Sequence, residues 1–166
     1  MKSMRMLSLT AMLIGSMAAI AIAQDDKPAV VPAATSKFAT LPVTPPCLTL
    51  SAQRGDPSKE AAVILIKMTP GCTVPWHWHT ANENIMFVKG TGKLEMKDEA
   101  PHNVGPGDFA FLPSKHVHQF TCTAACTFFD QTSAAFDLHY VDKDGKEIPP
   151  EQALKSGKKP ASAKKK

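Results

Sequence analysis

The sequence predicts an all-β fold, and two observations carry this prediction. Short apolar or β-branched runs recur along the chain, and turn-forming residues separate them at short intervals. The same region shows no apolar repeat of the 3.6-residue period that an amphipathic helix requires. This combination is typical of a barrel or a sandwich of short strands.

The expected strands lie between Cys47 and Val141. Residues 61–68 are β-branched and apolar, which is typical of a buried strand, and Thr69-Pro70-Gly71 ends it. Further strands are expected at 47–50, 74–79, 84–89, 93–97, 107–112, 116–122, 126–130 and 136–141. Polar turns or loops are expected at 54–58, 90–92, 98–106 and 142–145, and one helical turn at 151–154. We expect 116–122 and 126–130 to form a hairpin.

The first 23 residues are expected to be a secretory signal peptide. Lys2 and Arg5 precede an uncharged run that ends at Ile20, and Ala21-Ile22-Ala23 has the form of a cleavage site. The run is shorter than the ~20 residues that a transmembrane helix needs. We therefore expect a periplasmic or secreted protein without stable membrane insertion.

Composition divides the remaining chain into three parts. Residues 24–46 are rich in proline and are expected to form an arm or linker, and 47–150 are expected to form the barrel domain. The tail 151–166 holds six lysines and one glutamate and is expected to be disordered. Because residues 24–150 carry 11 basic and 14 acidic side chains, the net charge of +4 does not indicate a nucleic-acid-binding face.

Four cysteines in an exported chain allow three full disulfide pairings. The spacing of Cys122 and Cys126 suits a three-residue hairpin loop that brings their sulfurs together. This spacing favours a Cys122–Cys126 disulfide and, by elimination, Cys47–Cys72.

Four residues of metal-ligand type form the most informative pattern in the chain. His77 and His79 are two apart and therefore project from the same face of a strand. Glu83 follows after a short polar turn, and His118 belongs to a second cluster, which also contains His116. Three imidazoles and one carboxylate suit a borderline divalent metal ion.

The same residues give the chain its family resemblance. The run resembles the first motif of the cupin superfamily, G-x5-H-x-H-x3-E-x6-G, and matches it at Gly71, His77, His79, Glu83 and Gly90. The second motif, G-x5-P-x-G-x2-H-x3-N, is matched at Gly107, Pro113 and His118. Lys115 stands in place of its second glycine and Cys122 in place of its asparagine. The chain is most similar to a small single-domain cupin of type 2.

The resemblance implies a double-stranded β-helix, that is, a jelly-roll barrel with a metal ion inside. It implies that His77, His79, Glu83 and His118 hold one divalent ion of iron, manganese, nickel, copper or zinc. Such a ligand set leaves coordination positions open for a substrate, water or O₂.

Other residues near the motifs are candidates for function. Glu83 and His116 are candidate catalytic groups. His116 is expected either to donate a hydrogen bond to a metal ligand or shuttle a proton, or to cap a turn at the barrel mouth. Phe87 and Phe120 are the best pocket candidates, whereas Ile85, Phe109 and Phe111 suit either a pocket or ordinary core. Trp76 and Trp78 are expected to face outward, against the arm or a partner subunit.

Two main hypotheses of function follow, and the sequence leaves open whether the chain is an enzyme. The first is an exported metal-dependent enzyme, a dioxygenase-like oxidoreductase or an isomerase, that acts on a small organic substrate. The alternative is a non-catalytic sensor, carrier or storage protein that binds metal and a small ligand. A purely structural metal is a third option, and a homodimer is left open.

Overall fold

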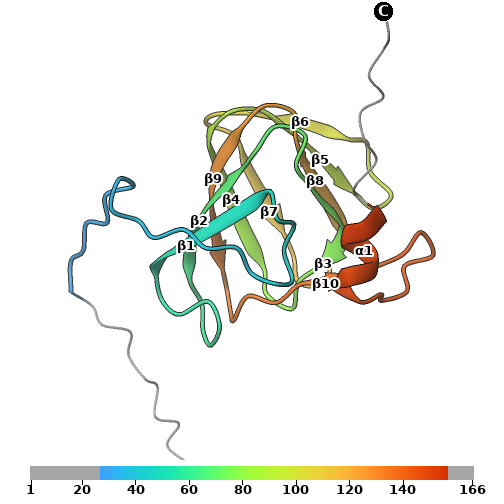
Figure 1. Cartoon of the computed structure of the whole chain (residues 1–166), viewed down its shortest axis with the longest axis horizontal. Helices are drawn as coiled ribbons and strands as arrows, with labels where there is room; N and C mark the ends of the chain where they lie inside the picture. Colours follow the sequence, from blue (N-terminus) through green and yellow to red (C-terminus); the bar gives the residue numbers. More distant parts are fainter. Residues whose placement is uncertain (1–26, 157–166) are drawn as a thin grey trace, which may run out of the picture.

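The computed structural model describes residues 27–156, which form two antiparallel five-stranded sheets that face each other (Figure 1). The first sheet has the order β1 (Leu48–Arg54), β2 (Val63–Met68), β9 (Cys126–Thr132), β4 (Glu83–Lys89) and β7 (Phe109–Leu112). The second sheet has the order β10 (His139–Tyr140), β3 (Thr73–Trp78), β8 (His118–Cys122), β5 (Gly92–Met96) and β6 (His102–Val104). The predicted all-β jelly-roll fold is confirmed. The proposed signal peptide and most of the tail lie outside the described residues.

The expected hairpin at 116–130 is wrong. Strand β8 pairs with β3 and β5, whereas β9 pairs with β2 and β4. The connection Thr123–Ala125 therefore crosses from the second sheet to the first. Two neighbouring strands separated by a short turn look like a hairpin in the sequence, and only the long-range pairing tells the arrangements apart.

The strand boundaries differ from expectation at two places. The expected polar loop 98–106 contains the short strand β6, whose residues His102 and Asn103 are exposed and which forms by pairing with β5. An exposed edge strand needs no apolar alternation, so the sequence gives no sign of it. The expected strand 136–141 is reduced to β10, because only His139 and Tyr140 pair with β3.

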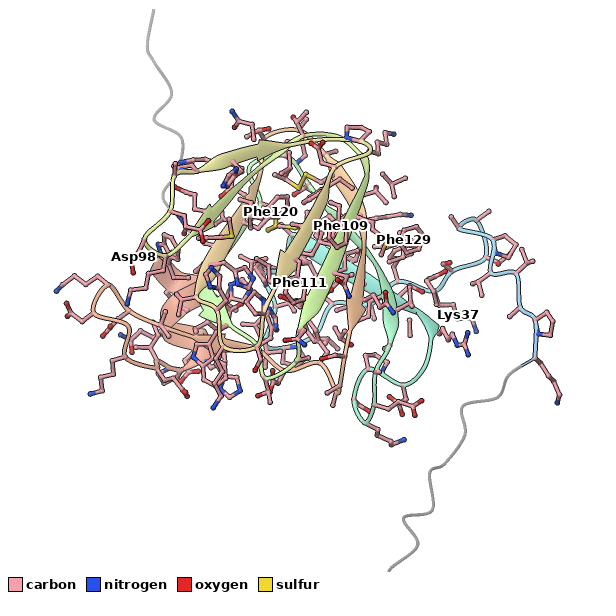
Figure 2. The ribbon with its side chains drawn as sticks, turned by 180° about the vertical axis from the view of Figure 1, so that it is seen from behind. Lys37, Asp98, Phe109, Phe111, Phe120 and Phe129 are labelled. Carbon is pink, nitrogen blue, oxygen red and sulfur yellow. A yellow bond between two sulfur atoms is a disulfide. The ribbon has the colours of Figure 1, made fainter. Side chains whose placement is uncertain are left out.

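The core lies between the two sheets and has an aromatic centre. The rings of Phe87, Phe120 and Phe128 lie 5.4–5.6 Å apart, centroid to centroid. Phe109 and Phe111 belong neither to this core nor to the cavity inside the barrel, because they pair with Met86 and Asn84 on the outer face of the first sheet, where they line a surface groove. They are 60% and 54% exposed. Figure 2 labels both side chains.

Two disulfides tie the ends of strands together. The structure pairs Cys47 with Cys72 and Cys122 with Cys126, the pairing that the sequence favours. The arm before Cys47 runs along β1, where Ala39 and Leu50 form a β-bridge, and Val43 accepts a hydrogen bond from the Tyr140 hydroxyl. The helix α1 (Pro150–Ser156) lies beside β10 (Figure 1). Within residues 27–156, no helix has the length and apolarity needed to cross a membrane.

Candidate metal centre

A bulge in β3 aims the two motif histidines into the barrel. Val74 pairs with Phe120 and His77 with His118, so β3 has one more residue than β8 between these pairs. Without that extra residue, strict alternation from the buried Val74 would turn His77 outward. With it, His77 and His79 are both buried, while Trp76 and Trp78 take the other face.

All three histidines present the same ring nitrogen to the interior. Nδ1 of His77 lies 2.6 Å from the Pro75 carbonyl oxygen, and Nδ1 of His118 lies 2.9 Å from that of His116. Nδ1 of His79 donates to the carbonyl oxygen of Asp137. A carbonyl oxygen can only accept, so each Nδ1 carries the proton and each Nε2 keeps a free lone pair.

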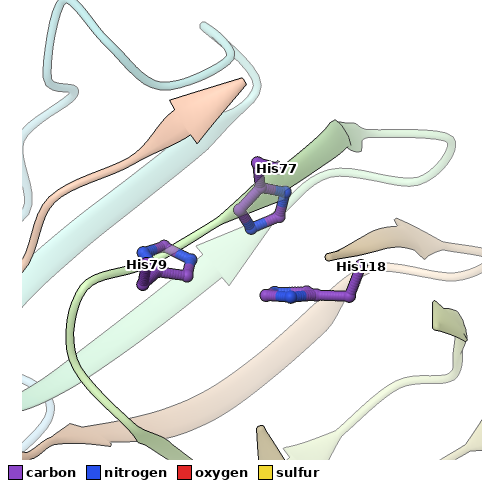
Figure 3. A group of neighbouring side chains, drawn as sticks. All are labelled: His77, His79 and His118. Carbon is purple, nitrogen blue, oxygen red and sulfur yellow. The ribbon is translucent and has the colours of Figure 1, made fainter. Parts of the chain in front are cut away.

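The three imidazoles converge on one point (Figure 3). Their ligand nitrogens all lie within 4.8 Å of one another, and the ring centroids of His77 and His118 are 4.2 Å apart. Each side chain is at most 4% exposed. A divalent metal ion bound by imidazole needs this arrangement, so His77, His79 and His118 can together hold a metal ion.

Glu83 adds a carboxylate from the opposite sheet. It is the first residue of β4 and is 3% exposed. Its Oε1 lies 3.2 Å from Nε2 of His79, and its Oε2 lies 3.5 Å from Nε2 of His118. Two electron-rich atoms face each other at each contact, so the arrangement calls for a proton or a cation between them. The donor set therefore fits a divalent ion.

Burial keeps the three imidazoles in the neutral state that metal binding needs. It lowers the pKa of His79 to about 3 and the pKa of His118 to about 4, and it holds the pKa of His77 well below its usual range. The histidines are therefore neutral at pH 7. Burial, reinforced by the nearby Asp130 carboxylate, raises the pKa of Glu83 well above its usual range in the metal-free site.

Asp130 is a second buried carboxylate that the sequence analysis missed. It lies in the middle of β9, is 2% exposed and interacts with the Glu83 carboxyl group. Burial raises its pKa to about 7. The alternation of β9 could have revealed it, because Asp130 is in phase with the inward-facing Cys126 and Phe128.

His77, His79 and both carboxylates border a cavity of about 50 Å³ inside the barrel. Phe87 and Phe120 line it, as the sequence predicts for a pocket. The other lining residues are Thr44, Leu48, Leu50, Ile66, Val74, Ile85, Phe128, Phe136 and Leu138. Of all the lining residues, only Phe136 and Leu138 are partly exposed, so the entrance lies at the connection between β9 and β10.

His116 contributes its backbone to the site. It lies in a turn in which its N–H donates to the Pro113 carbonyl, and β8 begins only at His118. The strand expected at 116–122 therefore begins two residues later, at His118. The cause is Lys115, which has a φ of 62° at the position where the motif has glycine, and this left-handed backbone breaks the extended conformation.

The outward tryptophans have other partners than the expected arm. Trp78 stacks on His139, with ring centroids 3.9 Å apart, and Lys115 lies over its ring. Trp76 lines a surface groove together with Lys97 and Lys143. The arm instead bridges to β1 in the first sheet, whereas both tryptophans lie on β3 in the second.

Comparisons with known proteins agree with this class of site. Residues 64–130 match the family Cupin_2, described as the Cupin domain. A segment of 61 residues, 37% of the chain, is 34% identical to the dimethylsulfoniopropionate lyase DddQ of Ruegeria pomeroyi and covers 30% of that protein's length.

Solved structures extend the similarity to the whole barrel. The polyketide cyclase RemF from Streptomyces resistomycificus superposes with a TM-score of 0.60 at 19% identity, over 77% of this chain and 99% of RemF. KdgF from a Halomonas species gives a TM-score of 0.54 at 15% identity, over 63% and 92% of the two chains. Fold and site define a barrel with an internal three-histidine cluster. The match to the cupin domain covers the residues that hold this cluster.

Proposed function

We propose that this chain is an exported, metal-dependent cupin enzyme that acts on a small organic molecule. The single observation that carries the proposal is the convergence of three neutral imidazoles at a buried point that Glu83 also reaches. Structural metal sites are saturated by protein ligands, whereas this ligand set leaves room for an exogenous ligand on a five- or six-coordinate ion. The adjoining cavity supplies the space for it.

Each residue has a definite role in this proposal. His77, His79 and His118 hold the ion through Nε2, and the backbone carbonyls of Pro75, Asp137 and His116 fix their orientation. Glu83 supplies the anionic ligand and can accept a proton from a bound substrate. The ion, one of iron, manganese, nickel, copper or zinc, would supply Lewis-acid or O₂ chemistry.

Similar proteins support a reaction on a small molecule. The relatives named above include a lyase that acts on dimethylsulfoniopropionate and a polyketide cyclase. We infer from the chain's own site a dioxygenase-like or isomerase-like reaction, because it offers a metal site with open positions and one carboxylate close by.

Export to the periplasm or the exterior is part of the proposal. The charged, apolar and A-x-A pattern of residues 1–23 supports it. The two disulfides support it as well, because disulfides persist in oxidising compartments.

Turnover by the metal-loaded protein tests the proposal. We expect product from at least one substrate in a panel of phenols, flavonols, thiols and diketones, and no product from His79→Ala. His139→Ala is the matched control, because His139 lies 33% exposed outside the cluster and its loss should leave turnover in place. Turnover that persists in His79→Ala would contradict the proposal.

A non-catalytic binding protein is the second candidate. The lining of the cavity favours it, because it offers no nucleophile: apart from its two histidines and two carboxyl groups, its side chains are apolar or, at Thr44, already hydrogen-bonded. This candidate predicts that a small molecule stays bound through purification and is recovered unchanged by mass spectrometry. Conversion of that molecule by the metal-loaded protein would favour the enzyme.

We also propose a homodimer formed through the outer face of the first sheet. Phe109, Phe111, Met86 and Val88 lie on neighbouring strands there and are 37–60% exposed. Exposed apolar side chains that adjoin in this way are typical of interaction surfaces. Sedimentation equilibrium tests the idea: the wild type should be dimeric and Phe111→Ser monomeric. A monomeric wild type would contradict it.

A further inference from the structure

Apart from its two carboxyl groups, the cavity beside the cluster offers no free hydrogen-bond donor. The Thr44 hydroxyl already donates to the Leu41 carbonyl oxygen at 2.9 Å and accepts from the Leu41 N–H. The Nδ1 protons of His77 and His79 are committed to backbone carbonyls. Among residues 27–156, no lysine or arginine lines the cavity.

Two buried carboxyl oxygens remain as the available acceptors. Within the described part of the chain, Oδ1 of Asp130 and Oε2 of Glu83 have no hydrogen-bond partner. A buried polar atom without a partner is costly, so these atoms indicate where a ligand would complete the site. Glu83 is occupied by the metal in the proposed function, whereas Asp130 lies one strand further along the first sheet, on β9.

We propose that the site selects a small uncharged organic molecule that carries a hydroxyl group, and that Asp130 accepts the hydrogen bond from that hydroxyl. The inference rests on the proposed function, because it names the substrate class of the same site. Away from the proposed metal ion, an anionic group placed beside Asp130 would meet two carboxyl groups and no cationic side chain in this low-dielectric interior, which is unfavourable. A neutral ligand with an O–H donor meets a complementary surface.

The size and the walls of the cavity restrict the rest of the molecule. A volume of about 50 Å³ accommodates a ligand of only a few non-hydrogen atoms, or the tip of a larger one. Phe87, Phe120 and Phe128 form an aromatic wall that suits a hydrocarbon part. Phe136 and Leu138 at the entrance are apolar too, so a ligand that enters there passes an apolar rim.

Three probes of nearly equal size test the proposal, because they differ in one group each. Hydroxyacetone carries a hydroxyl and no charge, glycolate replaces its methyl group by an anionic oxygen, and butanone replaces its hydroxyl by a methyl group. Dissociation constants are measured by NMR titration for the wild type, Asp130→Asn and Asp98→Asn. Asp98 is an exposed carboxylate on another part of the surface and serves as the control.

We expect wild type and Asp98→Asn to bind hydroxyacetone about tenfold more tightly than butanone. In Asp130→Asn, the affinity ratio of hydroxyacetone to glycolate should fall at least about tenfold, because one negative charge is lost. An unchanged ratio, or equal binding of hydroxyacetone and butanone by the wild type, would overturn the proposal. The wild-type comparison stands even where Asp130→Asn does not fold.

Measurements with cobalt(II)-loaded and with metal-free protein test the metal site and the role of Asp130 separately. A wild type that takes up no cobalt(II) contradicts the proposed metal site, while the probe ratios in metal-free protein still decide the role of Asp130. A wild type that binds cobalt(II) with probe ratios insensitive to Asp130→Asn leaves the metal site in place and refutes the substrate class.

Discussion

Oε1 of Glu83 lies 3.2 Å from Nε2 of His79, and neither atom carries a proton when the carboxylate is ionised. The proton of His79 is on Nδ1, where the Asp137 carbonyl holds it. The contact is therefore repulsive unless a proton or a metal ion lies between the two atoms. The same contact therefore lowers the stability of the metal-free protein and raises its affinity for a metal ion.

Glu83→Gln separates the two effects. The amide N–H of the new glutamine can donate to Nε2 of His79, and the substitution removes a buried carboxyl group. We therefore expect the metal-free variant to melt at a higher temperature than the wild type. Metal affinity should fall roughly tenfold or more, because a neutral amide is a poor ligand. Calorimetry and a chelator competition measure the two quantities. A variant that keeps wild-type affinity would show that Glu83 is no ligand.

Asp130→Asn should change the pH dependence of metal-free stability. The folded pKa of about 7 lies above the ordinary value of 3.8, so the folded state binds the extra proton between these values. The stability that the protonated Asp130 contributes is complete below pH 3.8 and is lost as the pH rises through about 7. The free energy of unfolding of the variant should therefore rise relative to that of the wild type between about pH 4 and pH 7, by roughly 2–4 kcal/mol. Denaturant melts at several pH values measure this gain, and a difference independent of pH contradicts the assignment.

The two disulfides should contribute unequally to stability. Cys47–Cys72 spans 25 positions and Cys122–Cys126 spans 4. Loop entropy then predicts a loss of about 3.5 kcal/mol for Cys47→Ser with Cys72→Ser, and about 2 kcal/mol for Cys122→Ser with Cys126→Ser. Urea denaturation of the two double variants gives the comparison. A larger loss from the short loop would argue against the entropic explanation.

Gly90 and Gly71 allow the cost of a left-handed backbone to be separated from the cost of a steric collision. Both have a φ in the left-handed region, 79° and 75°. A Cβ at Gly90 would also collide with the Ala125 carbonyl oxygen, whereas a Cβ at Gly71 meets nothing within 4 Å. Gly71→Ala should cost about 1–2 kcal/mol and Gly90→Ala clearly more. Thermal melts of both variants test this. Equal losses of stability would contradict it, because they would mean that the backbone at Ala125 moves away from the new Cβ at little cost.

The sequence predicts the fold class and the ligand-type residues because both depend on local pattern. Alternation and turn residues reveal most strands, and the spacing of His77, His79, Glu83 and His118 identifies the cluster. The sheet assignment of β8 and β9 could not be predicted, because pairing depends on contacts far apart in the chain.

Residues of the site that act through the backbone left no trace in the sequence. The bulge before His77 and the carbonyls of Pro75, Asp137 and His116 are consequences of the folded chain. Asp130 differs, because its inward phase on β9 is visible in the sequence once the strand is assigned. The sequence is misleading at Lys115. This residue replaces the glycine of the motif, yet it still adopts a glycine-like φ of 62°.

The metal content of protein exported to an oxidising compartment decides whether His77, His79 and His118 hold a metal ion. Plasma mass spectrometry is applied to the wild type, His118→Ala and His116→Ala, the last as a control for a neighbouring imidazole outside the cluster. We expect about one equivalent of a transition metal in the wild type and in His116→Ala, and almost none in His118→Ala. A wild type without metal after purification free of chelators, or full occupancy in His118→Ala, would contradict it.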